Sequence, residues 1–234
     1  MVTLNSEIKS RLKQEGACLV GFADISELGV EVRDKMKFAV SMAVALDAGI
    51  IDEISKGPTK RYYQEYKRAN EFLSYLCKET VDIFKKHGNN AAAIEPTIKE
   101  LDFETLATKL PHKTIATLAG LGWVGKSALL ITREYGPAIR FASVLTDAEL
   151  EVGEPIKKSY CGDCDKCVIH CPARAISGET WEHGMKREII YDAFACCDNA
   201  KELSGKIGVP STICGICINV CPWTQQYISR QKVD

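Results

Sequence analysis

The stretch Cys161-Gly-Asp-Cys164-Asp-Lys-Cys167-Val-Ile-His-Cys171-Pro172 is a C-x2-C-x2-C-x3-C-P run. This spacing is typical of the thiolate ligands of a cubane iron–sulfur (4Fe–4S) cluster. The three closely spaced cysteines bind three corners of one cube. In proteins with two clusters, the fourth cysteine ligates the other cluster. The run therefore predicts a second cysteine run elsewhere in the chain.

That second run is Cys214-Gly-Ile-Cys217-Ile-Asn-Val-Cys221-Pro222. The same spacing would place its first ligand at position 211, where the chain has Ser211. The two runs thus supply seven of the eight thiolates that two cubane clusters need. Cys196 and Cys197 lie between the runs, and either of them could be the eighth ligand.

We therefore predict two 4Fe–4S clusters, each held by cysteines of both runs. The predicted ligands of the first cluster are Cys161, Cys164, Cys167 and Cys221. Those of the second are Cys171, Cys214 and Cys217, with one of Cys196 and Cys197. A structural zinc site or a set of disulfides is the alternative, because C-x2-C pairs also suit zinc. Zinc sites do not require the x3-C-P continuation twice, so the doubled run favours iron–sulfur clusters.

The composition is that of an ordinary globular protein, with 234 residues, 46% hydrophobic and 26% charged. The longest apolar run, residues 38–46, is too short to span a bilayer, and the N-terminus lacks a secretory pattern. Eleven cysteines in such a chain indicate metal ligands in a reducing compartment. We therefore expect a cytoplasmic protein that works anaerobically. A net charge of −1 gives no global attraction for nucleic acid.

Hydrophobic periodicity predicts helices and strands mixed along the chain up to about residue 150. This pattern indicates an α/β domain over residues 1–152, followed by a ferredoxin-like domain over residues 153–234. Cys18 and Cys77 fall within predicted elements and are expected to be buried thiols. The predicted helices cover 4–15, 58–87 and a segment starting near Pro111; the predicted strands cover 17–23, 37–46 and 91–95, with 128–132 and 139–146 as a pair.

The loop Gly120-Leu-Gly122-Trp-Val-Gly125-Lys126-Ser127 fits two phosphate-binding patterns, the dinucleotide fingerprint and the P-loop. Both patterns require a strand before the loop and a helix after it. Here a helix is expected before the loop and a β-branched segment after it. An iron–sulfur ATPase stays open as an alternative, with residues 139–145 as a Walker B strand ending near Asp147. The two other interpretations are a glycine-rich corner that packs backbone against backbone and a loop lying along a large flat cofactor.

Two tyrosines, Tyr62 and Tyr63, lie at the start of the long predicted helix. Aromatic side chains there could flank a planar cofactor. A tyrosine stripe at helical spacing is more often part of a core.

Residues 118–132 and 134–147 resemble the epoxyqueuosine reductase family and the related corrinoid reductive dehalogenases. As in those families, they are followed by a double 4Fe–4S region that ends in Cys221-Pro-Trp223. The segment Asp192-Ala-Phe-Ala-Cys196 resembles the family segment with the isolated eighth ligand, which favours Cys196 over Cys197.

The resemblance implies a nitroreductase-like α/β domain that holds a base-off cobalamin, to which the nearer cluster passes electrons. It also implies an electron donor such as a ferredoxin or a flavodoxin. Tyr62 and Tyr63 lie where the reductases have an Arg-Asp-Tyr-His-like stretch. By position, the residues that would border the corrin are Gly120, Gly122, Trp123, Gly125 and Lys126.

The chain also departs from the family. Residues 108–113 lack the carboxylate that is proposed as proton donor, and the helical repeats that follow the clusters in many relatives are absent from this sequence. We therefore expect a reductase of an unidentified small molecule or modified nucleoside, with tRNA possible but disfavoured and the catalytic residues unknown. The alternative is a non-enzymatic electron-transfer protein or a reductive activator of a corrinoid partner. The candidate proton donors are Lys109, His112, Tyr62 and Tyr63.

Overall fold

The computed structural model describes residues 3–97 and 102–232. Its strands are β1 (Leu19–Asp24), β2 (Phe38–Ala45), β3 (Ala91–Ile94), β4 (Trp123–Val124), β5 (Leu130–Ile131) and β6 (Ile139–Thr146). Its helices are α1 (Leu4–Glu15), α2 (Ala48–Asp52), α3 (Lys60–Lys86), α4 (His112–Leu118), α5 (Lys166–Ile169), α6 (Arg187–Ile190), α7 (Ala193–Lys206), α8 (Ile216–Asn219) and α9 (Pro222–Gln231).

The chain folds into two compact units that interleave along the sequence. The first, here called the sheet unit, comprises Met1–Ala45, Ala69–Leu121 and Arg140–Ile156. The second, the cysteine unit, comprises Leu46–Arg68, Gly122–Ile139 and Lys157–Asp234. The single boundary at 152/153 that the sequence suggests stays a prediction.

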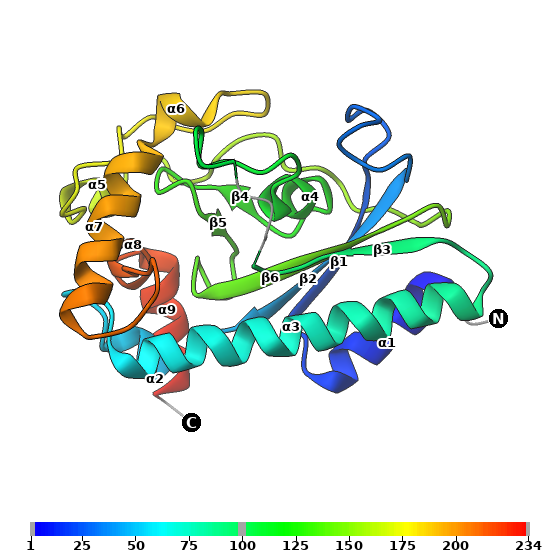
Figure 1. The fold of residues 1–234 in the computed structure, drawn as a ribbon, viewed down its shortest axis with the longest axis horizontal. Coiled ribbons are helices and arrows are strands. Elements are labelled where there is room, and N and C mark those ends of the chain that lie inside the picture. Colours follow the sequence, from blue (N-terminus) through cyan, green and yellow to red (C-terminus); the bar gives the residue numbers. More distant parts are fainter. Residues whose placement is uncertain (1–2, 98–101, 233–234) are drawn as a thin grey trace. The chain divides into compact units, whose positions relative to one another are not determined.

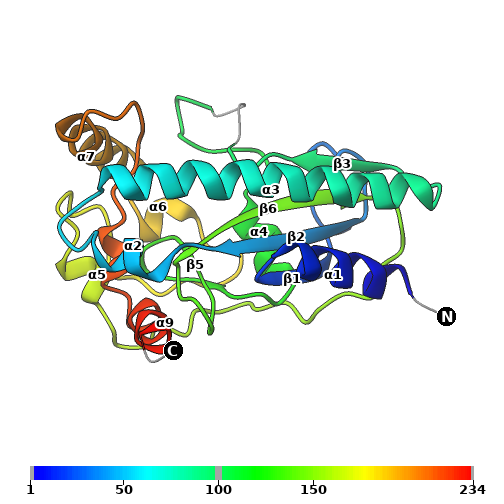
Figure 2. The same ribbon diagram turned by 90° about the horizontal axis from the view of Figure 1, so that it is seen from below.

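The sheet unit is built on a four-stranded sheet in the order β1-β2-β6-β3. The outer pairs, β1 with β2 and β3 with β6, are antiparallel. Figures 1 and 2 show α1 and α3 on one face of this sheet and α4 on the other. With both faces covered, the central strand β2 is buried over six of its eight residues, which explains its nearly continuous apolar sequence.

Helix α1 confirms the prediction of a helix over residues 4–15. Thr3 caps its first turn by accepting the N–H of Ser6, and Ile8 and Leu12 turn inward with no exposed surface. Gly16 ends the helix in the left-handed region, at φ 114°, where a side chain would be strained.

The long helix and the first strands also follow the sequence prediction. Helix α3 spans Lys60–Lys86, and its predicted apolar face is buried at Ala69, Leu73, Leu76 and Phe84. Each of the strands β1, β2 and β3 lies within two residues of its predicted bounds at either end.

One predicted strand pairing is wrong. The sequence suggests that residues 128–132 pair with 139–146 across the turn near Gly136. Instead β5 pairs with β4 in a separate two-stranded sheet, and β6 joins the four-stranded sheet. Only a single bridge, between Thr132 and Gly136, closes the turn. Alternating hydrophobicity marks a strand but does not identify its partner.

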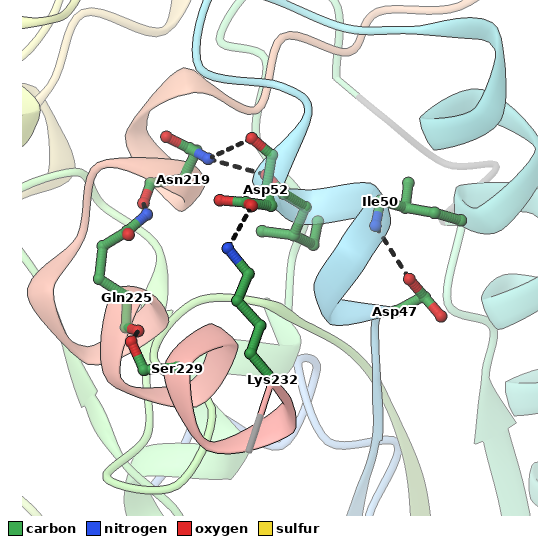
Figure 3. Close-up of polar contacts among 8 residues, drawn as sticks. Asp47, Ile50, Asp52, Asn219, Gln225, Ser229 and Lys232 are labelled. Carbon is green, nitrogen blue, oxygen red and sulfur yellow. Dashed lines mark hydrogen bonds and ion pairs between the residues drawn. The ribbon is translucent and has the colours of Figure 1, made fainter. Parts of the chain in front are cut away.

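The cysteine unit has short helices and a two-stranded sheet. Figure 3 shows how a buried amide ties its parts together: Asn219 Nδ2 donates to the carbonyls of Ile51 at 2.8 Å and Asp52 at 3.3 Å. These carbonyls lie in the last turn of α2, where few intrahelical donors remain, and that of Ile51 also accepts the N–H of Ile54 at 3.4 Å. Gln225 Nε2 donates in turn to the carbonyl of Asn219 at 2.7 Å. Asn219 thus fixes the second cysteine run against α2.

Among the described residues, no helix combines the length and the apolar character needed to cross a membrane.

Candidate functional site: two cysteine groups and a glycine loop

The first group of thiols gathers around Cys167. Burial, and after it the neighbouring Cys161, Cys221 and Cys164, raise the pKa of this thiol to about 11. Burial likewise raises the pKa of Cys221 to about 11, and Cys161 and Cys164 add to the rise. Thiols act on one another in this way only when they lie close together. The four predicted ligands of the first cluster therefore lie together in the cysteine unit.

Cys221 is also the N-cap residue of α9. The backbone N–H groups of Trp223 and Thr224 lie near its sulfur and oppose the rise of its pKa. These two N–H groups belong to the first turn of the helix, which has no carbonyl partners for them. A thiolate at this place is favoured by the nearby N–H groups and by the positive end of the helix dipole.

The second group gathers around Cys217. Burial raises the pKa of this thiol well above its usual value, and Cys214, Cys196, Cys167 and Cys171 raise it further. The pKa of Cys214 is raised by burial and then by Cys196 and Cys171. Cys171, Cys196, Cys214 and Cys217 are the predicted ligands of the second cluster, with Cys196 as the eighth ligand. The effect of Cys167 on Cys217 shows that the two groups are neighbours.

Cys196 is supplied by α7, a helix that Asp192 caps by accepting the N–H groups of Phe194 and Ala195 at 3.0 Å each. The hydroxyl of Tyr191 donates a hydrogen bond to Cys196, and Cys171 lies near enough to raise the pKa of Cys196 after burial. Cys197 raises only the pKa of its chain neighbour Cys196 among the resolved shifts of the described residues. This geometry favours Cys196 over Cys197 as a member of the second group.

All eleven cysteines are free thiols. In the sheet unit, Cys77 is a buried core residue as expected, whereas Cys18 is only half-buried; burial raises the pKa of each to about 12. Within residues 3–97 and 102–232, no three His, Cys, Asp or Glu side chains converge closely enough to hold a single metal ion. A cubane cluster is a body of several atoms ligated at its corners, so its four thiolates need not converge on one point.

The glycine loop runs from α4 into the hairpin of β4 and β5. A helix therefore precedes the loop and a strand follows it, the reverse of the order that phosphate-binding loops need. Asp147, the candidate Walker B residue, accepts hydrogen bonds from the backbone N–H and side-chain amide of Asn90. The loop therefore lacks the strand-loop-helix arrangement that both nucleotide-binding interpretations require.

The glycines of the loop are required by the packing of the chain itself. A Cβ on Gly122 would lie 2.2 Å from the carbonyl oxygen of Ile131, and a Cβ on Gly125 would lie 2.2 Å from Cδ1 of the same residue. In the sheet unit, a Cβ on Gly120 would lie 2.7 Å from the carbonyl oxygen of Glu154. These close approaches match the glycine-rich corner that the sequence left open.

The part of the loop in the cysteine unit packs beside the first thiol group. The Cβ position of Gly125 is 3.4 Å from the sulfur of Cys161. Trp123 packs edge-to-face against Tyr160 and Trp223, with ring centroids 5.2 and 5.4 Å away. These two aromatic residues lie next to Cys161 and close to Cys221 in the sequence. The loop and the first group thus share one packed region.

Three further predicted cofactor residues of the loop and helix are polar. Lys126 is 8% exposed, and no described residue forms an ion pair or hydrogen bond with its ammonium group. Tyr62 is buried and packs near the Cβ position of Gly215, 3.2 Å from its Cε1. Tyr63 is half-buried, and Lys67 lies over its ring at 4.9 Å. Tyr62 therefore serves the core beside the second cysteine run, as a tyrosine stripe often does.

The candidate proton donors are placed differently. His112 is buried in the sheet unit, and both ring nitrogens have partners: the hydroxyl of Ser143 at 3.1 Å and the carbonyl of Glu95 at 2.9 Å. Burial lowers its pKa to about 4. His112 is thus a neutral core residue, whereas Lys109 is exposed.

Sequence reasoning missed two features of this region. It did not identify Tyr191 as a hydrogen-bond donor to Cys196, although the residue lies only five positions away. It also missed that segment Leu46–Arg68 folds with the cysteines. Neither feature has a local signal in the sequence.

Comparison with known proteins identifies the kind of domain in which these thiol groups lie. Residues 160–224 match the model of a 4Fe–4S double cluster binding domain. This range contains all eight predicted ligands. The presence of a double-cluster domain is thereby confirmed.

Similar proteins match a larger part of the chain. An epoxyqueuosine reductase of Aliivibrio fischeri is 26% identical over 185 residues, which is 76% of this chain and 47% of that protein. The chain therefore spans about half the length of this relative.

Solved structures match nearly the whole chain. A reductive dehalogenase described with a mechanism for B12-dependent dehalogenation has a TM-score of 0.72 at 20% identity, over 98% of this chain and 33% of that one. An epoxyqueuosine reductase solved with an epoxyqueuosine-modified tRNA stem loop has a TM-score of 0.61 at 22% identity, over 95% and 65%.

These likenesses confirm the predicted fold class, a mixed helix-and-sheet domain with a double-cluster module. They also confirm the resemblance that the glycine loop and the cysteine runs suggest. The chain is a homologue of proteins named epoxyqueuosine reductase, and it shares their fold with the reductive dehalogenases.

Proposed function

We propose that this chain is a corrinoid (cobalamin)-dependent iron–sulfur reductase. When bound, two 4Fe–4S clusters and a cobalamin supply the one-electron chemistry that connects an electron donor, such as a ferredoxin or flavodoxin, to the substrate. The protein binds these groups, orients them and excludes water, as is usual for cofactor enzymes.

One observation carries the proposal: the first thiol group and the glycine loop pack together. The sulfur of Cys161 is 3.4 Å from the Cβ position of Gly125. Trp123 contacts the aromatic neighbours of Cys161 and Cys221. A cluster in the first group would therefore lie directly beside the loop that resembles the family's corrin-bordering segment.

The thiols fit iron–sulfur clusters in number and in chemistry. Burial raises the pKa of Cys167, Cys221 and Cys217, so these thiols stay protonated unless a cation is bound. Cluster binding releases those protons and makes the thiolates ligands. The proposed ligands are Cys161, Cys164, Cys167 and Cys221 for the first cluster, and Cys171, Cys196, Cys214 and Cys217 for the second.

The fit to a cobalamin is narrower. The chain's own packing accounts for Gly120, Gly122 and Gly125, so the missing Cβ atoms do not by themselves argue for a flat cofactor. The feature that a cofactor would use is Lys126, a residue only 8% exposed that has no ion-pair partner among the described residues. The proposal of a cobalamin thus rests on the family resemblance and on the B12-dependent mechanism described for the similar dehalogenase structure. We assign no reaction step to the loop.

The substrate class follows from the relatives. One relative was solved with an epoxyqueuosine-modified tRNA stem loop, so a modified nucleoside or another small molecule is proposed here. A net charge of −1 disfavours a whole tRNA, whose backbone binds to basic surfaces. Eleven free thiols suit a cytoplasmic, anaerobic setting.

A second candidate function is an electron-transfer protein or reductive activator that acts on a corrinoid held by a partner. The burial of His112 favours this second function, because both ring nitrogens of this candidate proton donor already have partners within the protein and cannot serve a substrate. Such a protein would reduce the partner's corrinoid without binding one tightly itself.

Titration of cobalamin into the anaerobically reconstituted protein tests the proposal. We expect a change in the visible spectrum that saturates at one cobalamin per chain at micromolar protein. Lys126→Ala should weaken the binding, whereas the exposed Lys109→Ala should not. No spectral change at micromolar protein would refute the corrinoid part. Reduction of a corrinoid partner protein by the reduced clusters would then establish the second candidate.

A further inference from the structure

Three buried side-chain polar atoms in the described part of the chain have no hydrogen-bond partner: Ser41 Oγ, Trp123 Nε1 and Thr224 Oγ1. Ser41 belongs to the central strand β2 of the sheet unit. The other two lie in the cysteine unit, in the region of the first thiol group. A buried N–H or hydroxyl left without a partner costs about 1–3 kcal/mol. Such an atom in a native interior calls for an explanation.

Trp123 is held in place on both sides. It is 1% exposed, with Tyr160 and Trp223 edge-to-face against its ring at interplanar angles of 88° and 76°. Each of these aromatic residues follows or precedes a first-group cysteine closely in the sequence. The indole N–H is a donor only. What it lacks in this region is an acceptor.

The first thiol group offers acceptors of the right kind. The backbone N–H groups of Trp223 and Thr224 lie near the sulfur of Cys221. The sulfurs of a cubane cluster accept further hydrogen bonds, and these bonds help to set its reduction potential. We infer that the indole N–H of Trp123 donates a hydrogen bond to the first cluster and raises its reduction potential. This inference rests on the two-cluster part of the proposed function and does not require a corrinoid.

The direction of the effect follows from charge. Reduction adds one electron to the cluster, so the reduced form carries one more negative charge and attracts the N–H dipole more strongly. Removing the donor therefore disfavours the reduced form. The second cluster provides an internal comparison, because the hydroxyl of Tyr191 donates to Cys196, one of its proposed ligands.

A redox titration followed by electron paramagnetic resonance tests the inference, on anaerobically reconstituted protein without added cobalamin. In Trp123→Phe, which keeps an aromatic ring, one of the two clusters should become about tenfold harder to reduce, about 59 mV more negative for one electron. Tyr191→Phe should lower the potential of the other cluster. Trp181→Phe, which removes a different indole N–H of the same unit, should shift neither.

An unchanged pair of potentials in Trp123→Phe with full iron content would overturn the inference, and weaker cobalamin binding in that variant would assign the N–H to the corrin instead. If Trp123→Phe fails to keep its iron, protein labelled with ¹⁵N at the tryptophan indoles supplies a second readout. In a Trp223→Phe background, which retains Trp123 and Trp181, electron–nuclear double resonance should detect one coupled indole ¹⁵N–H at a reduced cluster. Its absence would likewise overturn the inference. Failure of the protein to bind cobalamin leaves either readout valid.

Discussion

The sheet unit and the cysteine unit differ in what stabilises the interior of each. The sheet unit has a conventional apolar core, with strands β1 and β2 and helix α4 contributing buried residues such as Ala23, Ala39 and Ile115. The cysteine unit has short helices and a hairpin of two-residue strands, and nine of its buried or half-buried side chains are thiols. The difference teaches that the sheet unit can hold its fold by hydrophobic burial, whereas the cysteine unit needs its clusters as a core.

Removal of iron should produce the largest difference in stability between the two units. With the clusters chelated, amide exchange in peptides of residues 160–224 should become about a hundredfold faster, the effect of losing about 2.7 kcal/mol of ligand stabilisation. Peptides from β1, β2 and β6 should change little. Hydrogen-exchange mass spectrometry measures both sets in one sample. An equal loss of protection in the two units would remove the distinction.

The glycine loop tests the packing of the cysteine unit. Gly122→Ala forces a Cβ to within 2.2 Å of the Ile131 carbonyl oxygen, and a neighbouring backbone yields poorly. We expect a loss of about 3 kcal/mol in the free energy of unfolding. Gly205→Ala, in α7, has no atom within 4 Å of the new Cβ and should gain about 0.5–1 kcal/mol. Urea unfolding under anaerobic conditions compares them. A Gly122→Ala variant as stable as the wild type would contradict the close approach.

The sheet unit has its own test in His112. Burial lowers the pKa of this histidine to about 4, below the value of about 6.5 in an unfolded chain. Below pH 6.5 the unfolded state therefore binds more protons than the folded state. The sheet unit should lose up to about 3 kcal/mol of stability as the pH falls from about 6.5 to about 4, and be fully stable above that window.

An NMR titration of the imidazole Cε1 protons measures the cause directly. His112 should show no protonation above pH 5. Half-protonation of His112 at pH 6 or above would mean that its site is open to water.

The smallest effects distinguish buried from exposed polar contacts within the cysteine unit. Asn219→Ala removes the side-chain donor to the carbonyls of Ile51 and Asp52 and should cost about 2 kcal/mol. Lys232→Ala removes only the exposed ion pair with Asp52, at 2.7 Å, and should cost about 0.5 kcal/mol or less. Thermal unfolding ranks the two variants. Equal losses would show that the amide does not hold the cysteine run to α2.

The sequence was sufficient where the signal is local. The 3.6-residue period of α1 and α3 and the cap at Gly16 fix these helices within a few residues. The doubled cysteine spacing likewise predicts which thiols come together, because ligand geometry constrains spacing directly. Ser211 stands where a thiolate is expected, and counting the ligands that two clusters need pointed to Cys196 or Cys197 as the replacement. The structure brings Cys196 to the second group.

The remaining features depend on contacts between distant segments. The wrong pairing of residues 128–132 with 139–146 arose because β5 has only two residues and finds its partner in β4, inside the glycine loop. Tyr62 has the pattern of a core residue and of a cofactor contact alike, and only its packing near Gly215 distinguishes them. The unpartnered indole N–H of Trp123 has no trace in the sequence at all.

The central claim is that two 4Fe–4S clusters are held by two sets of four thiolates, with Cys196 completing the second. Iron and acid-labile sulfide, counted in reconstituted wild type, Cys196→Ser and Cys197→Ser, test it most directly. We predict eight irons and eight sulfides per chain in the wild type and in Cys197→Ser. In Cys196→Ser, the loss of one ligand should reduce the count toward four and leave the first cluster's paramagnetic signal. Four irons in the wild type, or an intact count in Cys196→Ser with a loss in Cys197→Ser, would contradict the account.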